Sequence, residues 1–105
     1  MAQFSVYHNK NKATQTQYPL LLNIQNDLLA TMQTCVVVPL TKFETMAHSP
    51  MGKLTPILAV QDQQYCMMTP QLAGINKREL GTEVEILTSH QHDIVAAIDF
   101  LLSGV

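Results

Sequence analysis

Residues 90–105 (HQHDIVAAIDFLLSGV) carry a helical periodicity that constrains how the rest of the chain can fold. Their apolar side chains recur three and four positions apart, which places them in one stripe of an amphipathic helix. This stripe consists of Ile94, Val95, Ala97, Ile98, Leu101, Leu102 and Val105. Thr88 and Gln91 match a capping box, and Asp93 suits the positive end of the helix dipole. The remaining elements must therefore offer an apolar face that covers this stripe.

Short strand-like segments fill the chain before this helix. Six of them show alternating or continuous apolar residues and are predicted to be strands: 3–8, 18–25, 34–40, 54–60, 64–69 and 74–80. Pro39 should mark the end or an edge of its strand, because proline donates no ladder hydrogen bond. Residues 9–17 and 41–53 are predicted to be loops, and Gly81 a turn. The pattern predicts one mainly β domain over residues 1–105, an antiparallel barrel or sandwich with the helix across one open side.

Charged residues make up only 13% of the chain, about half of the usual share. A domain of 105 residues exposes much of its surface, so few charges indicate a polar uncharged exterior or a surface covered in an oligomer. A homodimer is therefore expected. The net charge of −2 and the single arginine argue against direct nucleic-acid binding, which depends on clustered lysine and arginine.

Several features bear on compartment and cofactors. Cys35 and Cys66 lie in apolar runs, so they are expected to be core residues of a protein in the reducing cytoplasm. The chain shows no signal-peptide pattern, and no stretch approaches the ~20 apolar residues that span a membrane. His90 and His92 are two positions apart, which on a helix directs them to nearly opposite sides. No metal or other cofactor is expected.

A search for catalytic residues yields little. The four glycines are isolated, so they form no phosphate-binding loop. His8, Asp62 and Arg78 offer an acid–base–cation trio for phosphodiester cleavage, although any chain of this length offers such a trio. What remains is a binding feature: the helix runs to the end of the sequence, and Phe100 lies off its apolar stripe. The alternative is that Phe100 packs against a loop or a second subunit.

Seven pieces of the sequence follow one another in a specific order and spacing, which is more informative than any single piece. They are QFSVY (3–7), NIQNDLL (23–29), VVVPL (36–40), TPILAV (55–60), YCMMT (65–69), Gly81 and HDIVAAIDFLLSGV (92–105). Taken together, they resemble the CcdB family of bacterial toxins over essentially the whole chain. The resemblance implies an SH3-like antiparallel barrel with a C-terminal α-helix, assembled as a homodimer.

The resemblance also implies a function that rests on binding alone. Members of the family are toxins of type II toxin–antitoxin modules. They bind the A subunit of DNA gyrase and trap the enzyme on cleaved DNA, so they are topoisomerase poisons and not enzymes. A partly disordered CcdA-like antitoxin neutralises them by folding over the dimer. Such modules imply plasmid maintenance, with transcription autoregulated by toxin and antitoxin together.

Gyrase contacts are implied at specific positions. In the family the last three residues of the helix are the principal determinants, with further contacts near the helix end and after an acidic turn. The matching residues here are Ser103, Gly104, Val105, Leu102, Asp99, Leu28 and Leu29. The best-known member has tryptophan at the position of Ser103 and asparagine at that of Asp99. Losing a tryptophan removes a typical interface hot spot, for which Phe100 could compensate in part.

Two other functions stay open. MazF-like endoribonuclease toxins share this barrel, so fold alone does not separate them from a gyrase poison. RNA cleavage would then depend on His8 or Arg78, and the scarcity of arginine counts against it. Alternatively, the chain is a relic that binds an antitoxin without poisoning gyrase, and Ser103 in place of tryptophan is the main support for that reading.

Overall fold

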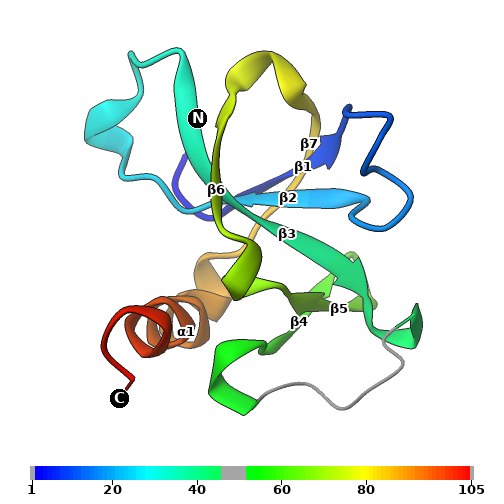
Figure 1. Cartoon of the computed structure of the whole chain (residues 1–105), viewed down its shortest axis with the longest axis vertical. Helices are drawn as coiled ribbons and strands as arrows, with labels where there is room; N and C mark the ends of the chain where they lie inside the picture. The colour runs from blue at the N-terminus through cyan, green and yellow to red at the C-terminus, as the bar shows by residue number, and fades with distance from the viewer. Residues whose placement is uncertain (1, 46–51, 105) are drawn as a thin grey trace.

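The computed structural model describes residues 2–45 and 52–104 (Figure 1). Over these residues the chain forms a seven-stranded sheet and one α-helix. The elements are β1 Ser5–Asn9, β2 Leu20–Asn23, β3 Thr34–Lys42, β4 Ile57–Val60, β5 Gln63–Met67, β6 Ala73–Asn76, β7 Leu80–Ile86 and α1 Gln91–Ser103. Short 3-10 turns lie between them: η1 Asp27–Leu29, η2 Phe43–Thr45, η3 Gly52–Leu54, η4 Thr69–Gln71, η5 Lys77–Glu79 and η6 Thr88–His90.

β3 is the central strand, because it pairs with β2, β5 and β6, and every pairing in the sheet is antiparallel. The order is β4-β5-β3-β2-β1-β7, and β6 pairs with β3 beside β5. The sheet curls, so the turn between β4 and β5 reaches β7, where the Gln61 side chain donates to the Val84 carbonyl at 3.2 Å. This half-barrel with one C-terminal helix confirms the predicted mainly β fold.

The main core lies inside the curl of the sheet. It joins alternate residues of the strands to the first half of α1, where Ile94 and Ala97 are fully buried. A smaller cluster of Leu21, Cys35 and Val37 packs on the other face of β3. The adjacent residues Val37 and Val38 lie in different clusters, so this part of β3 is buried on both faces.

Pro39 was predicted to mark the end or an edge of its strand, but it lies within β3, which has partner strands on both sides. On one side of β3, β6 pairs with Thr34–Val37 and β5 pairs with residues 40–42, so the partner strand changes next to Pro39. The Pro39 carbonyl points to that side, where it accepts from the backbone N–H of Met68 at 2.9 Å. The missing N–H of proline therefore falls at a break between two ladders and leaves no ladder hydrogen bond unmade.

The prediction was wrong about the region after residue 73. The strand expected over 74–80 ends at Asn76, and Gly81 lies within a seventh strand, β7, that pairs with β1. A Cβ atom on Gly81 would lie 3.0 Å from the backbone oxygen of His8 and 3.1 Å from its Cβ. The glycine thus permits a close approach of two strands and does not form a turn.

Two details of the helix also differ from expectation. The helix begins at Gln91, and Thr88 instead opens η6, so no capping box forms and the N-cap, His90, makes no side-chain cap bond. The buried stripe is narrower than predicted because Val95, Leu101 and Leu102 are exposed. Asp93 lies in the first turn as expected. No helix within residues 2–45 and 52–104 is long and apolar enough to cross a membrane.

Candidate partner-binding site

The end of α1 is closed by bonds within its own last turn. Gly104 adopts a left-handed conformation with φ of 74°, and its N–H donates to the Phe100 carbonyl at 2.8 Å. Glycine reaches this conformation without the steric penalty of a side chain. The Ser103 hydroxyl donates back to the Asp99 carbonyl at 2.7 Å. Val105 lies outside the described residues.

This helix end presents both apolar and polar groups. The Leu102 side chain is 78% exposed, and Ser103 and Gly104 are exposed beside it. Asp99 lines a hollow of about 550 Å³ along the outer face of α1, together with His92, Val95 and residues of η6. Phe100 is half-buried, so part of its ring is already covered within the chain. A group that docks here would meet Leu102 first.

A second apolar surface lies on the connection between β2 and β3, residues 24–33, which we call the η1 loop. Leu28 is 89% exposed, and Leu29 and Met32 are about half exposed. The loop begins with a cap, because the Asn26 side chain accepts from the Leu28 N–H at 2.8 Å. Met32 was not identified from the sequence, and the one available signal was its position three residues after the apolar pair Leu28-Leu29 in the same connection.

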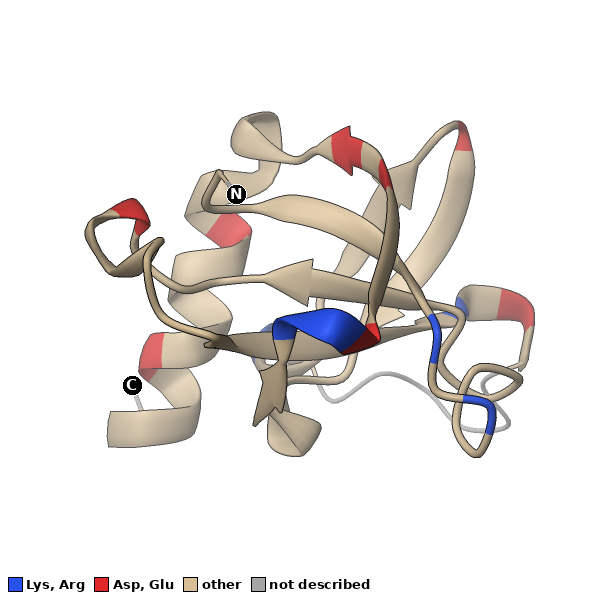
Figure 2. Ribbon diagram, turned by 90° about the horizontal axis from the view of Figure 1, so that it is seen from above, with Lys and Arg blue, Asp and Glu red and all other residues tan. Residues whose placement is uncertain are grey.

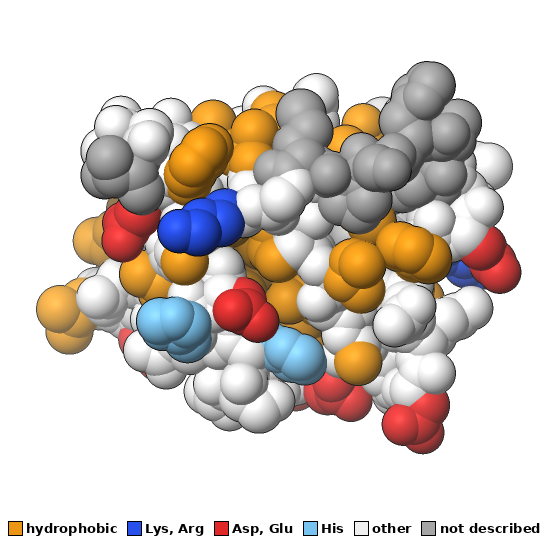
Figure 3. All heavy atoms as spheres, turned by 90° about the horizontal axis from the view of Figure 1, so that it is seen from below, with side chains coloured by type: hydrophobic (Ala, Val, Ile, Leu, Met, Phe, Trp, Pro, Cys, Tyr) orange, Lys and Arg blue, Asp and Glu red, His pale blue; other side chains and the backbone are white. Residues whose placement is uncertain are grey.

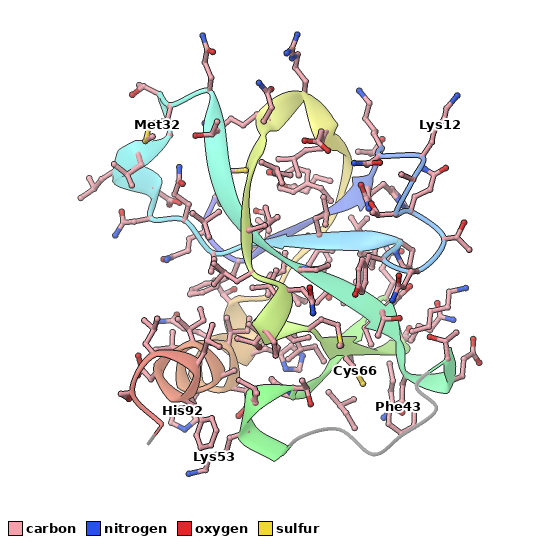
Figure 4. All side chains as sticks on the ribbon, in the orientation of Figure 1. Lys12, Met32, Phe43, Lys53, Cys66 and His92 are labelled. Atoms are coloured by element: carbon pink, nitrogen blue, oxygen red, sulfur yellow. The ribbon has the colours of Figure 1, made fainter. Side chains whose placement is uncertain are left out.

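The two surfaces lie apart on the chain. In Figure 1 the η1 loop is at the upper left and the end of α1 at the lower left, near opposite ends of the longest axis. Figure 4 shows the same separation between Met32 and His92. The structure therefore divides the predicted contact residues into an η1 set (Leu28, Leu29) and a helix-end set (Asp99, Leu102, Ser103, Gly104).

Positive charge gathers at a different edge. Lys10 and Lys12 lie on the β1–β2 connection and Lys77 and Arg78 on η5, and these segments touch, because the Lys10 N–H donates to the Glu79 carbonyl at 3.0 Å (Figure 2). Exposed His8 shares a hollow of about 640 Å³ with Lys10 and Lys12, and no carboxylate is among its lining residues.

The predicted trio of His8, Asp62 and Arg78 is spread over separate elements. His8 is on β1, Asp62 in the β4–β5 turn and Arg78 on η5, where it lines another hollow with Gln33, Asn76 and Lys77. General acid–base chemistry needs such groups within hydrogen-bonding reach of one reacting atom. The described contacts do not join the three.

The remaining reactive groups are structural. Cys35 and Cys66 are buried as predicted, and burial raises the pKa of both thiols, which keeps them protonated and unreactive. Within the described part of the chain, no three His, Cys, Asp or Glu side chains are grouped so that they could hold a metal ion.

Comparison with known proteins identifies the fold and the family. Among solved structures, an endoribonuclease from a mycobacterial species superposes with a TM-score of 0.70 at 17% identity, covering 97% of this chain and 90% of that one. An endoribonuclease in complex with its cognate antitoxin, also mycobacterial, gives a TM-score of 0.74 at 18% identity, covering 97% and 94%. At such identities the likeness shows the fold alone. The family model described as CcdB protein matches residues 3–104, so the chain belongs to the CcdB family, the toxins of toxin–antitoxin modules.

Proposed function

We propose that this protein binds the A subunit of DNA gyrase and traps gyrase on cleaved DNA, acting by binding alone in the cytoplasm. The observation that carries the proposal is the exposure of Leu102 on a helix end locked by Gly104 and Ser103. Burying one leucine side chain in a partner contributes about 1.5–3 kcal/mol. Leu28 and Leu29 would add a second contact of the same apolar kind.

The proposal includes a homodimer. Apolar side chains are exposed on α1, η2 and β4, namely Val95, Leu101, Phe43 and Ile57. Figure 3 shows the underside of the molecule in Figure 1, where α1, η3 and β4 lie and where hydrophobic side chains form patches between acidic, lysine and histidine side chains. Exposed apolar patches of this kind mark interaction surfaces. A second copy that covers this side also explains the low charge of the chain.

A CcdA-like antitoxin is the proposed second partner, and with it the toxin would regulate transcription of the module. Family membership supports this, as does a structural neighbour that was solved with its cognate antitoxin. A segment that folds on binding can follow an extended apolar surface, although ordering it lowers its net affinity.

The test is a count of covalent gyrase–DNA complexes in a sensitive bacterium that expresses the protein. We expect Leu102→Gln to lower this count at least tenfold, because the amide leaves the leucine contact unmade. Ile86→Gln is the matched control, since Ile86 is an exposed apolar residue on β7 that belongs to neither contact set. Wild-type protein that yields no complexes, or equal loss in both variants, would contradict the proposal.

An endoribonuclease is the second candidate function, and one observation favours it. The hollow that joins His8, Lys10 and Lys12 could accept an RNA phosphate beside a titratable group. Incubation with RNA separates the two functions: cleavage that disappears in His8→Gln supports the enzyme. A relic that only binds antitoxin predicts neither cleavage nor gyrase–DNA complexes, with antitoxin binding intact.

A further inference from the structure

We infer that Lys77 is a positioning residue, which sets the conformation of the η1 loop and so presents Leu28 and Leu29 to the partner. The inference rests on the proposed function for its consequence, but its geometry stands alone. Lys77 lies on η5, about fifty positions along the chain from the loop that it holds. The sequence around Lys77 therefore gives no sign that it contacts the η1 loop.

Lys77 bonds to the η1 loop twice. Its Nζ donates to the Ala30 carbonyl at 2.6 Å, and its backbone N–H donates to the Gln33 carbonyl at 2.9 Å. Ala30 is the residue that closes η1, so the ammonium caps the carbonyl end of that turn. The backbone bond continues the ladder between β3 and β6, whose last pair is Thr34 with Asn76.

Other bonds hold the beginning and the base of the loop. The Gln3 N–H donates to the Asp27 carboxylate at 2.6 Å. The Gln25 side chain accepts from the Val36 N–H and donates to the Leu29 and Thr34 carbonyls. Lys77 reaches the opposite end, after the exposed leucines. The segment that carries the leucines is thus anchored on both sides.

Among the residues that the structure describes, the Lys77 ammonium bonds to this carbonyl and forms no salt bridge. The residues that line the two hollows beside it include no aspartate or glutamate. Hydrogen bonds with a charged donor are shorter and stronger than neutral ones. Lys77 is half-buried, and it lines a cavity of about 10 Å³ together with Cys35 and Asn23. The bond therefore selects one loop conformation.

A preset loop binds more tightly because the partner does not have to order it. Without the ammonium, the residues after η1 gain conformational freedom in the unbound state. Hydrogen bonds to charged groups contribute enough that losing one weakens binding roughly tenfold. Removing the Lys77 ammonium should weaken the partner contact made by the η1 set. The contact made by the helix-end set should stay unchanged.

The experiment compares Lys77→Met with Arg78→Met on the full-length protein. Both remove one positive charge from η5, but the Arg78 side chain bonds only to Asn76 and not to the loop. We expect Lys77→Met to speed amide exchange at residues 28–33 and to weaken binding to purified gyrase A subunit roughly tenfold. Arg78→Met should change neither, and Lys77→Arg should restore most of the binding because it keeps a charged donor.

A double variant distinguishes positioning from general destabilisation. With Leu28 and Leu29 both changed to alanine, Lys77→Met should cause no further loss of gyrase binding. An equal loss in that background would overturn the inference, as would unchanged exchange at residues 28–33. If gyrase A does not bind the wild-type protein, the proposed function fails, while faster exchange in Lys77→Met would still establish the positioning role.

Discussion

The η1 loop and the end of α1 both expose leucines, but different kinds of contact hold them. The helix end is held by neighbours in the same turn, through Gly104 N–H to Phe100 and Ser103 Oγ to Asp99. The η1 loop has local bonds from Asn26 and Gln25, but it is also held from distant positions, by Gln3 and Lys77. The helix end should therefore tolerate changes elsewhere in the fold, whereas the loop should respond to substitutions far from it in the sequence.

The largest expected effect tests whether the helix end is needed for toxicity. Deleting residues 103–105 should abolish growth inhibition, because it removes the exposed end while the buried Ile94 and Ala97 stay in place. Thermal unfolding and dimer mass should be nearly unchanged. Full toxicity of the truncated chain would show that the helix end is not the contact.

A larger apolar side chain at the helix end should raise the affinity for gyrase A subunit. Ser103→Trp adds a large aromatic side chain at an exposed position, and interface hot spots of this kind contribute about 2 kcal/mol, or roughly 30-fold in affinity. Titration calorimetry with gyrase A subunit measures the gain. Equal affinity of both proteins would mean that position 103 faces away from the partner.

The η1 loop should be sensitive at its base. Gln25→Ala removes three side-chain bonds and leaves the Val36 N–H without its acceptor, so the free energy of unfolding should fall by about 1–3 kcal/mol. Gln64→Ala is the matched control, because Gln64 is exposed on β5. Urea unfolding measures both. If both variants lowered the free energy of unfolding equally, the Gln25 bonds would stabilise the protein no more than an exposed side chain on β5 does.

The smallest effect concerns the backbone at the helix end. Gly104→Ala should destabilise the last turn by about 1 kcal/mol, because alanine disfavours the left-handed conformation, although a Cβ there meets nothing within 4 Å. Gly74→Ala also meets nothing within 4 Å and has no positive φ, so it should be nearly neutral. Amide exchange at residues 100–104 reports the difference, and equal exchange in both variants would argue against local closure of the helix.

Local patterns predicted most of the strands, the helix and the buried cysteines, because apolar periodicity reports burial directly. These patterns gave wrong predictions where the structural role of a residue depended on a strand far away in the sequence. Gly81 was interpreted as a turn, yet it permits the approach of β1 to β7. Pro39 was interpreted as a strand end, yet it lies where β3 changes partners. The candidate contact residues came from family resemblance and not from periodicity.

The sequence by itself determined a mainly β domain with one terminal amphipathic helix, because side-chain periodicity selects secondary structure without reference to the rest of the chain. Tertiary structure decided how much of that helix is buried and that Leu28 and Leu102 lie on separate surfaces. It also decided that Lys77 holds the η1 loop. These features depend on contacts between residues far apart in the chain, and such contacts exist only after the sheet has curled.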